Sequence, residues 1–282
     1  AQATAASEAI GHVIIAIAAN GGLGNIQEGA NQLHAAARSY RRALELAGEL
    51  SPPVASEAQL GLARILYEWN DLAAAEQHAQ CSRQLAAQMQ NTDRAVIGEV
   101  FYARLQLAQG DPAAAAARLA KAEQAAQAQH FVLCLPEIAA AQVYTLLRQG
   151  QLAAAAQLAE ARELPLSLAR VRLAQGDGAA AMALLEPLRR QAESAGWADE
   201  RLRIQVLQAL ALHVQGDAGA AGQLLAGALA QAEPEGFTRL FVDEGPAIAP
   251  LLAAAVAQGI MPDYAGKLLA LVAEVGQKSR AQ

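Results

Sequence analysis

The chain has 282 residues and a formal net charge of −6, and this acidic balance argues against a large nucleic-acid-binding surface. Hydrophobic residues make up 54% of the chain, but aromatic residues only 4%, so alanine dominates the apolar content. Because alanine has the highest helix propensity, the composition predicts an all-α protein with a sizeable core.

The first thirty residues predict a weak helix at about residues 7–19, interrupted by the glycine-rich run from Asn20 to Asn25. No lysine follows these glycines as it would in a phosphate-binding loop, so we interpret the run as a helix break. We expect residues 1–30 to form an N-terminal cap or a partial repeat.

A recurring turn organises the chain from residue 31 to residue 232. Each copy begins with Gly or Asn, which can take the left-handed conformation that ends a helix. Several copies continue with Asp, which can cap the next helix. Successive turns are 39, 40, 40, 26 and 40 residues apart, and such a period indicates a helical solenoid. The turn residues are Asn31, Asn70, Gly110, Gly150, Gly176 and Gly216.

Small residues flank every turn at fixed distances. Alanine stands five residues after each turn, and the position seven residues before it is small in every copy except at Val143. Two small sites on neighbouring helices predict a tightly packed hairpin similar to the tetratricopeptide repeat (TPR), lengthened from about 34 to about 40 residues. We therefore predict an all-α, right-handed α-α superhelix, a TPR-like solenoid, over residues 31–232.

The helices of these repeats can be placed from the turns and prolines. Only the repeat between Gly150 and Gly176 is abbreviated. The predicted helices span about 32–49, 54–69, 72–90, 94–109, 113–129, 136–149, 152–163, 165–175, 179–195, 199–215 and 218–232.

The period breaks at residue 233, and residues 233–282 predict a closing region with helices at about 247–258 and 263–276 and a frayed tail. The runs EPEGF at 233–237 and RLFVDEGP at 239–246 resemble the segment that closes the helical-repeat domain of MalT-type regulators. These are the large ATP-binding members of the LuxR family of bacterial transcription activators. The run AAARSYRRAL at 35–44 is similar to the opening repeat of that domain.

This resemblance implies a signal-sensing domain whose effector is a small molecule or a regulatory protein. It also implies two partner domains outside this chain, an ATPase module and a helix-turn-helix that would follow residue 282. The chain has no Walker motif, and nothing after Ala270 resembles a recognition helix, so neither ATP nor DNA binding is expected of it. We expect no cofactor and no catalytic activity, and we leave a homo-oligomer open.

The cellular setting follows from weaker signals. Cys81 and Cys134 lack metal-ligand spacing and are interpreted as reduced thiols. The sequence starts at Ala1 without a signal peptide, and its longest apolar run, Val13 to Ala19, is too short to cross a bilayer. We expect a cytoplasmic fragment of a longer protein that makes no membrane contact.

The first helix of each pair should line the concave face of a solenoid. The position six residues before the turn holds Arg64, Arg104, Tyr144, Arg170 and Leu210, so that arginines recur along one face. Two helical turns earlier stand Glu57, Ile97, Glu137, Glu163 and Arg203. The candidate groove residues are Arg64, Arg104, Tyr144 and Arg170, with Tyr67, Tyr102 and His213 close to the same surface.

Two interpretations of this surface stay open. Arginines and aromatic rings could bind an anionic or hydroxyl-rich ligand. Alternatively, each arginine could pair with a glutamate of a neighbouring repeat and bind nothing.

Other classes of function find little support. The five histidines lack metal-ligand spacing, and the acidic pair Asp243-Glu244 is better explained by capping or inter-helix hydrogen bonds than by proton chemistry. The alternative to a sensor is a TPR-type scaffold that binds a partner protein and no small molecule.

Overall fold

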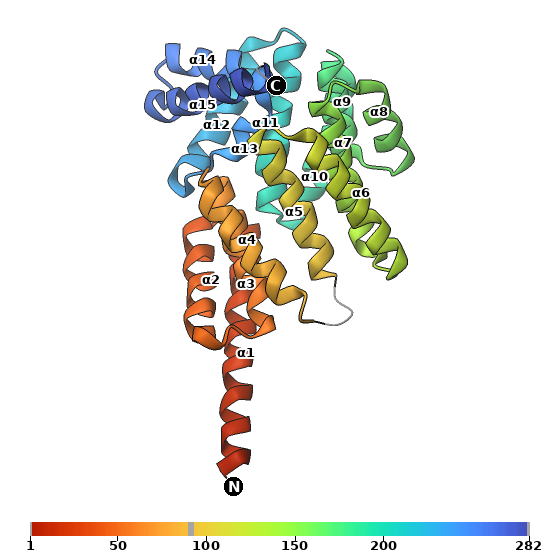
Figure 1. Ribbon diagram of the computed structural model, residues 1–282. Coiled ribbons are helices and arrows are strands. Elements are labelled where there is room, and N and C mark those ends of the chain that lie inside the picture. Colours follow the sequence, from red (N-terminus) through yellow and green to blue (C-terminus); the bar gives the residue numbers. More distant parts are fainter. Residues whose placement is uncertain (1, 90–92, 281–282) are drawn as a thin grey trace.

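The computed structural model describes residues 2–89 and 93–280, and within these residues every regular element is helical. Consecutive helices form hairpins around the predicted turns (Figure 1). The pairs are α1 (Gln2–Gly29) with α2 (Leu33–Ala47), α3 (Ser56–Glu68) with α4 (Leu72–Ala86), α5 (Arg94–Gln109) with α6 (Pro112–Ala128), α7 (Leu135–Arg148) with α8 (Leu152–Ala161), α9 (Pro165–Ala174) with α10 (Gly178–Ala195), and α11 (Ala198–Val214) with α12 (Ala218–Ala232).

The first helices of successive hairpins pack against one another in chain order, from α1 through α3, α5, α7 and α9 to α11. Helix α11 also contacts α1, and Asn31 Nδ2 donates a hydrogen bond to the Ala198 carbonyl at 2.9 Å. The first and last hairpins therefore meet, and the predicted all-α helical-repeat superhelix is confirmed.

The turns have the predicted chemistry. All six turn residues have a positive φ, from 59° at Asn31 to 92° at Gly110. The aspartates that follow the turns accept a hydrogen bond from the N–H three residues on, at 2.8 Å in the case of Asp111. The alanines five residues after each turn are fully buried, so the hairpins pack closely as expected. The capping aspartates are Asp71, Asp111, Asp177 and Asp217.

The predicted helix break at Asn20–Asn25 is wrong, because α1 runs without interruption from Gln2 to Gly29. Gly24 of α1 and Gly61 of α3 instead make room for the buried ring of Tyr40. A Cβ atom added at Gly24 would lie 2.4 Å from this ring, and one at Gly61 would lie 2.2 Å from it. The Tyr40 hydroxyl lies within hydrogen-bond distance of two acceptors, Asn25 Oδ1 at 2.7 Å and Glu28 Oε2 at 2.8 Å. Gly24 thus serves packing, and the glycine-rich run does not end the helix.

The closing region contains more turns than predicted. The two predicted helices are present as α14 (Ala249–Ala257) and α15 (Pro262–Arg280), which pack together beside α12 (Figure 1). Helix α15 continues to Arg280, through most of the tail that was predicted to fray. Unpredicted are the short helix α13 (Arg239–Val242) and the 3-10 turns η4 (Glu233–Glu235) and η5 (Gly245–Ile248).

Short 3-10 turns also connect hairpins, as η1 (Gly48–Leu50), η2 (Pro53–Ala55) and η3 (Val132–Cys134). Helix α4 ends at Ala86, before its predicted end at residue 90. Residue 90 lies outside the described residues, and so do residues 1, 281 and 282 of the predicted terminal regions. None of the helices within the described ranges is long and apolar enough to cross a membrane.

Candidate functional site

The segment of residues 233–246, here called the closing segment, lies against the first helices of the superhelix. Its backbone pairs with the end of α3: the Thr238 N–H donates to the Glu68 carbonyl at 2.8 Å, and the Leu240 N–H donates to Glu68 Oε2 at 3.1 Å. Trp69 Nε1 donates to the Glu235 carbonyl at 2.8 Å. Residues more than 160 positions apart are thereby joined at one site.

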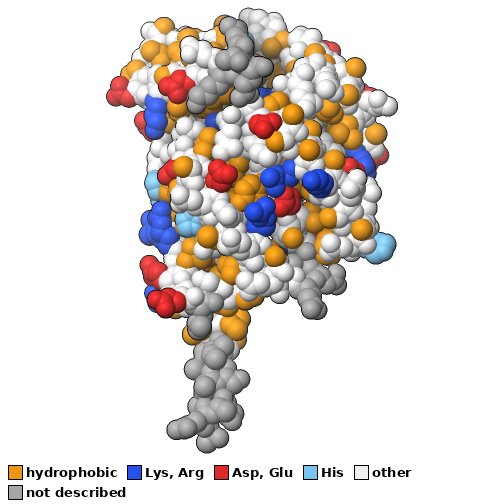
Figure 2. Space-filling model, viewed as in Figure 1, with side chains coloured by type: hydrophobic (Ala, Val, Ile, Leu, Met, Phe, Trp, Pro, Cys, Tyr) orange, Lys and Arg blue, Asp and Glu red, His pale blue; other side chains and the backbone are white. Residues whose placement is uncertain are grey.

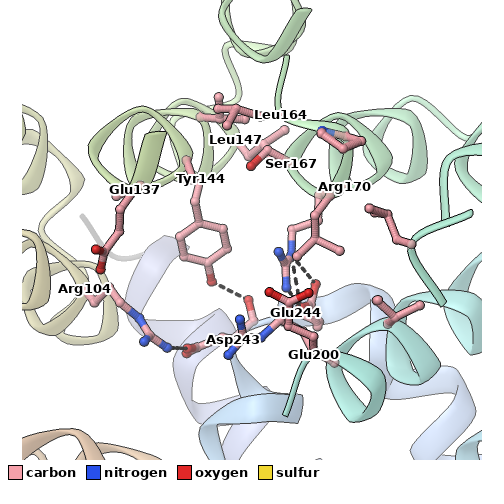
Figure 3. Close-up of a pocket in the computed structure, with 18 of the residues that line it drawn as sticks. Arg104, Glu137, Tyr144, Leu147, Leu164, Ser167, Arg170, Glu200, Asp243 and Glu244 are labelled. Atoms are coloured by element: carbon pink, nitrogen blue, oxygen red, sulfur yellow. Dashed lines mark hydrogen bonds and ion pairs between the residues drawn. The ribbon is translucent and has the colours of Figure 1, made fainter. Parts of the chain in front are cut away.

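Asp243 is the centre of this contact. Its carboxylate accepts a hydrogen bond from the Tyr67 hydroxyl at 2.8 Å and forms an ion pair with Arg239 Nη2 at 2.5 Å. The Tyr144 hydroxyl donates to its backbone carbonyl, and Arg104 Nη2 lies 3.8 Å from its Oδ2 (Figure 3). Side chains of α3, α5 and α7 therefore converge on one residue of the closing segment.

Glu244 makes the second strong contact. Its carboxylate receives the guanidinium of Arg170, with Nη2 2.7 Å and Nε 3.2 Å from Oε1 (Figure 3). Such a charge-assisted contact is stronger than a hydrogen bond between neutral groups. The acidic pair thus binds the groove arginines, in line with the predicted inter-helix role.

A cavity of about 410 Å³ lies between α5, α7, α9, α11 and the closing segment. Leu147, Leu164 and Leu166 contribute apolar walls, while Glu137 and Glu200 add acidic groups. The labelled side chains in Figure 3 surround this space from several helices. Three arginines, Arg104, Arg170 and Arg203, also line it.

The ionisable groups near the cavity are shifted chiefly by burial. Burial, followed by the charge of Asp243, raises the pKa of Tyr67 and of Tyr144. Burial also raises the pKa of Glu137. For Arg203, burial and then repulsion from Arg104 and Arg170 lower the pKa. The cavity therefore holds closely spaced positive charges in a partly dehydrated setting.

The sequence-predicted residues are only partly brought together. Arg104, Tyr144 and Arg170 line the cavity, and Tyr67 stacks beneath the Arg104 guanidinium, 4.8 Å from it. Arg64 instead binds Glu28 of α1 at 2.8 Å.

The other two predicted residues do not line this cavity. The ring of Tyr102 lies between the guanidinium groups of Arg83 and Arg118, at 5.3 and 5.0 Å. His213 is half-buried near the end of α11.

The alternative of pure Glu–Arg pairing between repeats describes part of the surface. Arg64 of α3 pairs with Glu28 of α1 at 2.8 Å, and Arg104 of α5 lies 3.7 Å from Glu68 of α3, as that interpretation expects. The partners of Arg104 and Arg170, however, include Asp243 and Glu244 of the closing segment. Arg203 was not among the candidate groove residues. Its position, two helical turns before the predicted groove position, holds acidic or apolar residues in the other repeats, and this difference was the available signal.

No group of three or more potential metal ligands occurs within the part of the chain that the structure describes. Cys81 is exposed, Cys134 is buried, and both thiols are free. The site is therefore built from guanidinium, carboxylate, phenol and apolar groups.

A family model described as the MalT-like TPR region matches residues 1–258. The chain belongs to this family. The matched part of this MalT-like domain contains all six hairpins, the closing segment and α14. The cavity residues therefore all fall inside the match, and the chain is a regulatory helical-repeat domain of the MalT-like type. A search of curated proteins gives no match.

Proposed function

We propose that this MalT-like domain is the signal-sensing part of a LuxR-family transcription activator and that a small-molecule effector binds in the 410 Å³ cavity. The observation that carries the proposal is the composition of the cavity wall, which combines leucine side chains with convergent charged groups. Small-molecule sites typically have this combination of apolar surface and a few orienting polar groups.

The same walls suggest how binding would be transmitted. They come from α5, α7, α9, α11 and the closing segment, so a ligand that contacts several of them favours one relative arrangement of the hairpins. That arrangement would be sensed by ATPase and DNA-binding domains outside this chain. In this proposal the domain is cytoplasmic, performs no catalysis and contacts neither DNA nor membrane itself.

Thermal unfolding of the chain against a panel of sugars, organic acids, phosphorylated metabolites and aromatic compounds tests the proposal. A ligand at about 100 times its dissociation constant stabilises by roughly 2.7 kcal/mol. The effect should disappear in Ala140→Phe, which places a ring in the cavity, and weaken in Arg104→Ala. Arg118→Ala is the matched control, since Arg118 pairs with Glu99 outside the cavity. A ligand whose effect survives Ala140→Phe would contradict binding in this cavity.

A second candidate, a TPR-type scaffold that binds a partner protein, is favoured by one observation on α1. Hydrophobic side chains of α1 are exposed, with Ile15 at 67% and Ile26 at 72% exposure. Figure 2 shows hydrophobic surface where α1 leaves the body of the molecule. A helix of a regulatory protein could pack on this surface. Co-purification of one partner that Ile15→Ser and Ile26→Ser abolish, without any response to small molecules, would favour the scaffold.

A further inference from the structure

Arg203 is the least satisfied cation of the cavity. It is half-buried on α11, and within the described residues its guanidinium has no hydrogen bond and no carboxylate at ion-pair distance. Asp199 and Glu68 attract it from farther away, but this attraction is weaker than the repulsion from Arg104 and Arg170. A partly dehydrated guanidinium is costly without a paired anion, and Glu137 and Glu200, which line the same cavity, form no ion pair with Arg203 within the described residues.

Arg104 is the second under-used cation. Its Nη2 lies 3.7 Å from Glu68 Oε1 and 3.8 Å from Asp243 Oδ2, both beyond hydrogen-bond distance. The face of its guanidinium rests on the Tyr67 ring, which fixes its position. The edge donors of Arg104 are therefore held in place without a close acceptor.

Arg170 differs from both, because Glu244 satisfies it at 2.7 Å. The Glu244 carboxylate thus neutralises Arg170, whereas Arg104 and Arg203 line the same cavity without a carboxylate at hydrogen-bond distance among the described residues. Both residues line the same space, and burial, followed by the charge of Arg104, lowers the pKa of Arg203.

We propose that Arg104 and Arg203 form an anion-binding site that receives the carboxylate or phosphate group of the effector. This inference rests on the proposed function and specifies the chemistry of its ligand. An anionic oxygen group between the two guanidinium groups would accept charge-assisted hydrogen bonds from both. The leucine walls beside it favour a ligand whose anionic group is attached to an apolar body.

The test measures thermal unfolding of the whole chain at constant ionic strength, with chloride replaced stepwise by inorganic phosphate or by benzoate. Phosphate probes the anion site alone, and benzoate adds an apolar ring. Either anion should raise the unfolding midpoint saturably above the chloride control. In R203Q the dissociation constant should rise at least tenfold, since a charge-assisted contact is lost. The control R201Q replaces an exposed arginine on the same helix and should change the dissociation constant less than twofold.

The behaviour of R203Q without anions separates a binding role from a structural one. Because Arg203 is repelled by its neighbours and unpaired, R203Q should unfold at the wild-type temperature or above it. A clearly lower midpoint would assign Arg203 to the structure and overturn the proposal. The proposal also fails if neither anion stabilises the chain beyond chloride, or if R203Q binds them as the wild type does.

Failure of the anion site and failure of the cavity can be distinguished. A neutral ligand that loses its effect in A140F, together with no response to phosphate or benzoate, would support the cavity and overturn the anion site. If no anion and no compound of the panel stabilises the chain, both proposals fail. A response to phosphate alone or to benzoate alone supports the site and indicates which anionic group the effector carries.

Discussion

Arg170 and Glu244 stand 74 residues apart in the sequence and form a close ion pair, with 2.7 Å between Nη2 and Oε1. Only 20% of the arginine side chain and 10% of the glutamate side chain are exposed. The pair joins α9, in the fifth of the six hairpins, to the closing segment. The closing segment is thus held by the arginines that line the groove and forms part of the cavity wall.

Glu244→Gln should destabilise the domain by about 1–3 kcal/mol, because it leaves the half-buried Arg170 guanidinium without its counter-charge. Urea denaturation followed by circular dichroism measures the change. Glu45→Gln is the matched control, since Glu45 pairs with Arg42 at 3.0 Å on an exposed helix face. This substitution should change the free energy of unfolding by less than about 0.5 kcal/mol. Equal effects of the two substitutions would show that the Arg170–Glu244 pair adds no special stability.

Gly24→Ala should destabilise the domain by about 1–3 kcal/mol or more, because the new methyl group overlaps the buried Tyr40 ring. Gly22→Ala in the same helix meets no atom within 4 Å and should stabilise by about 0.5–1 kcal/mol through helix propensity. Unfolding midpoints of both variants give the comparison. A stabilising Gly24→Ala would mean that Tyr40 does not occupy the space between α1 and α3.

Gln151→Asp should stabilise the domain by about 0.5–1 kcal/mol. Gln151 begins α8 with φ −86° and ψ 63° and makes no capping hydrogen bond. Asp71 begins α4 with φ −86° and ψ 75° and does cap the helix. The substitution therefore supplies the missing acceptor to a backbone already in capping geometry. Asp111→Ala removes an existing cap and should destabilise the domain by a similar amount. Thermal unfolding measures both variants, and midpoints that shift in the same direction would refute this account.

The free energy of unfolding should fall as pH rises above about 10, because the pKa of each of the five tyrosines is raised in the folded state. Burial is the main cause of the raised pKa of each, joined by Glu28 for Tyr40 and by Asp243 for Tyr67 and Tyr144. Burial likewise raises the pKa of Tyr102 and Tyr264. In the unfolded chain a tyrosine ionises near pH 10, so the unfolded state loses protons first and gains relative stability with rising pH.

The absorbance of tyrosinate at 295 nm measures this effect. Little of the signal should appear near pH 10 in the folded protein, and most should appear together with loss of helical circular dichroism at higher pH. In urea the same chain should titrate near pH 10. A gradual native-state titration near pH 10 would contradict the burial of these hydroxyl groups.

The sequence by itself determined the repeat architecture, because local chemistry fixes a helical hairpin. A left-handed Gly or Asn, a capping Asp and two small residues act within one hairpin, so their period reveals the turns and nearly all the helices. The fold of the closing runs EPEGF and RLFVDEGP was less accessible, since α13 is only four residues long.

Only the tertiary structure decided which charged groups meet. The spacing placed Arg104, Tyr144 and Arg170 on one face, but it did not place Asp243 and Glu244 against them, or bring Arg203 to the same cavity. Such contacts depend on the curvature of the superhelix, which is the sum of small rotations between successive hairpins. This curvature brings Asp243 into contact with Tyr67. Gly24 follows the same rule: only the position of Tyr40, between two helices distant in sequence, shows that this glycine accommodates a ring and does not break the helix.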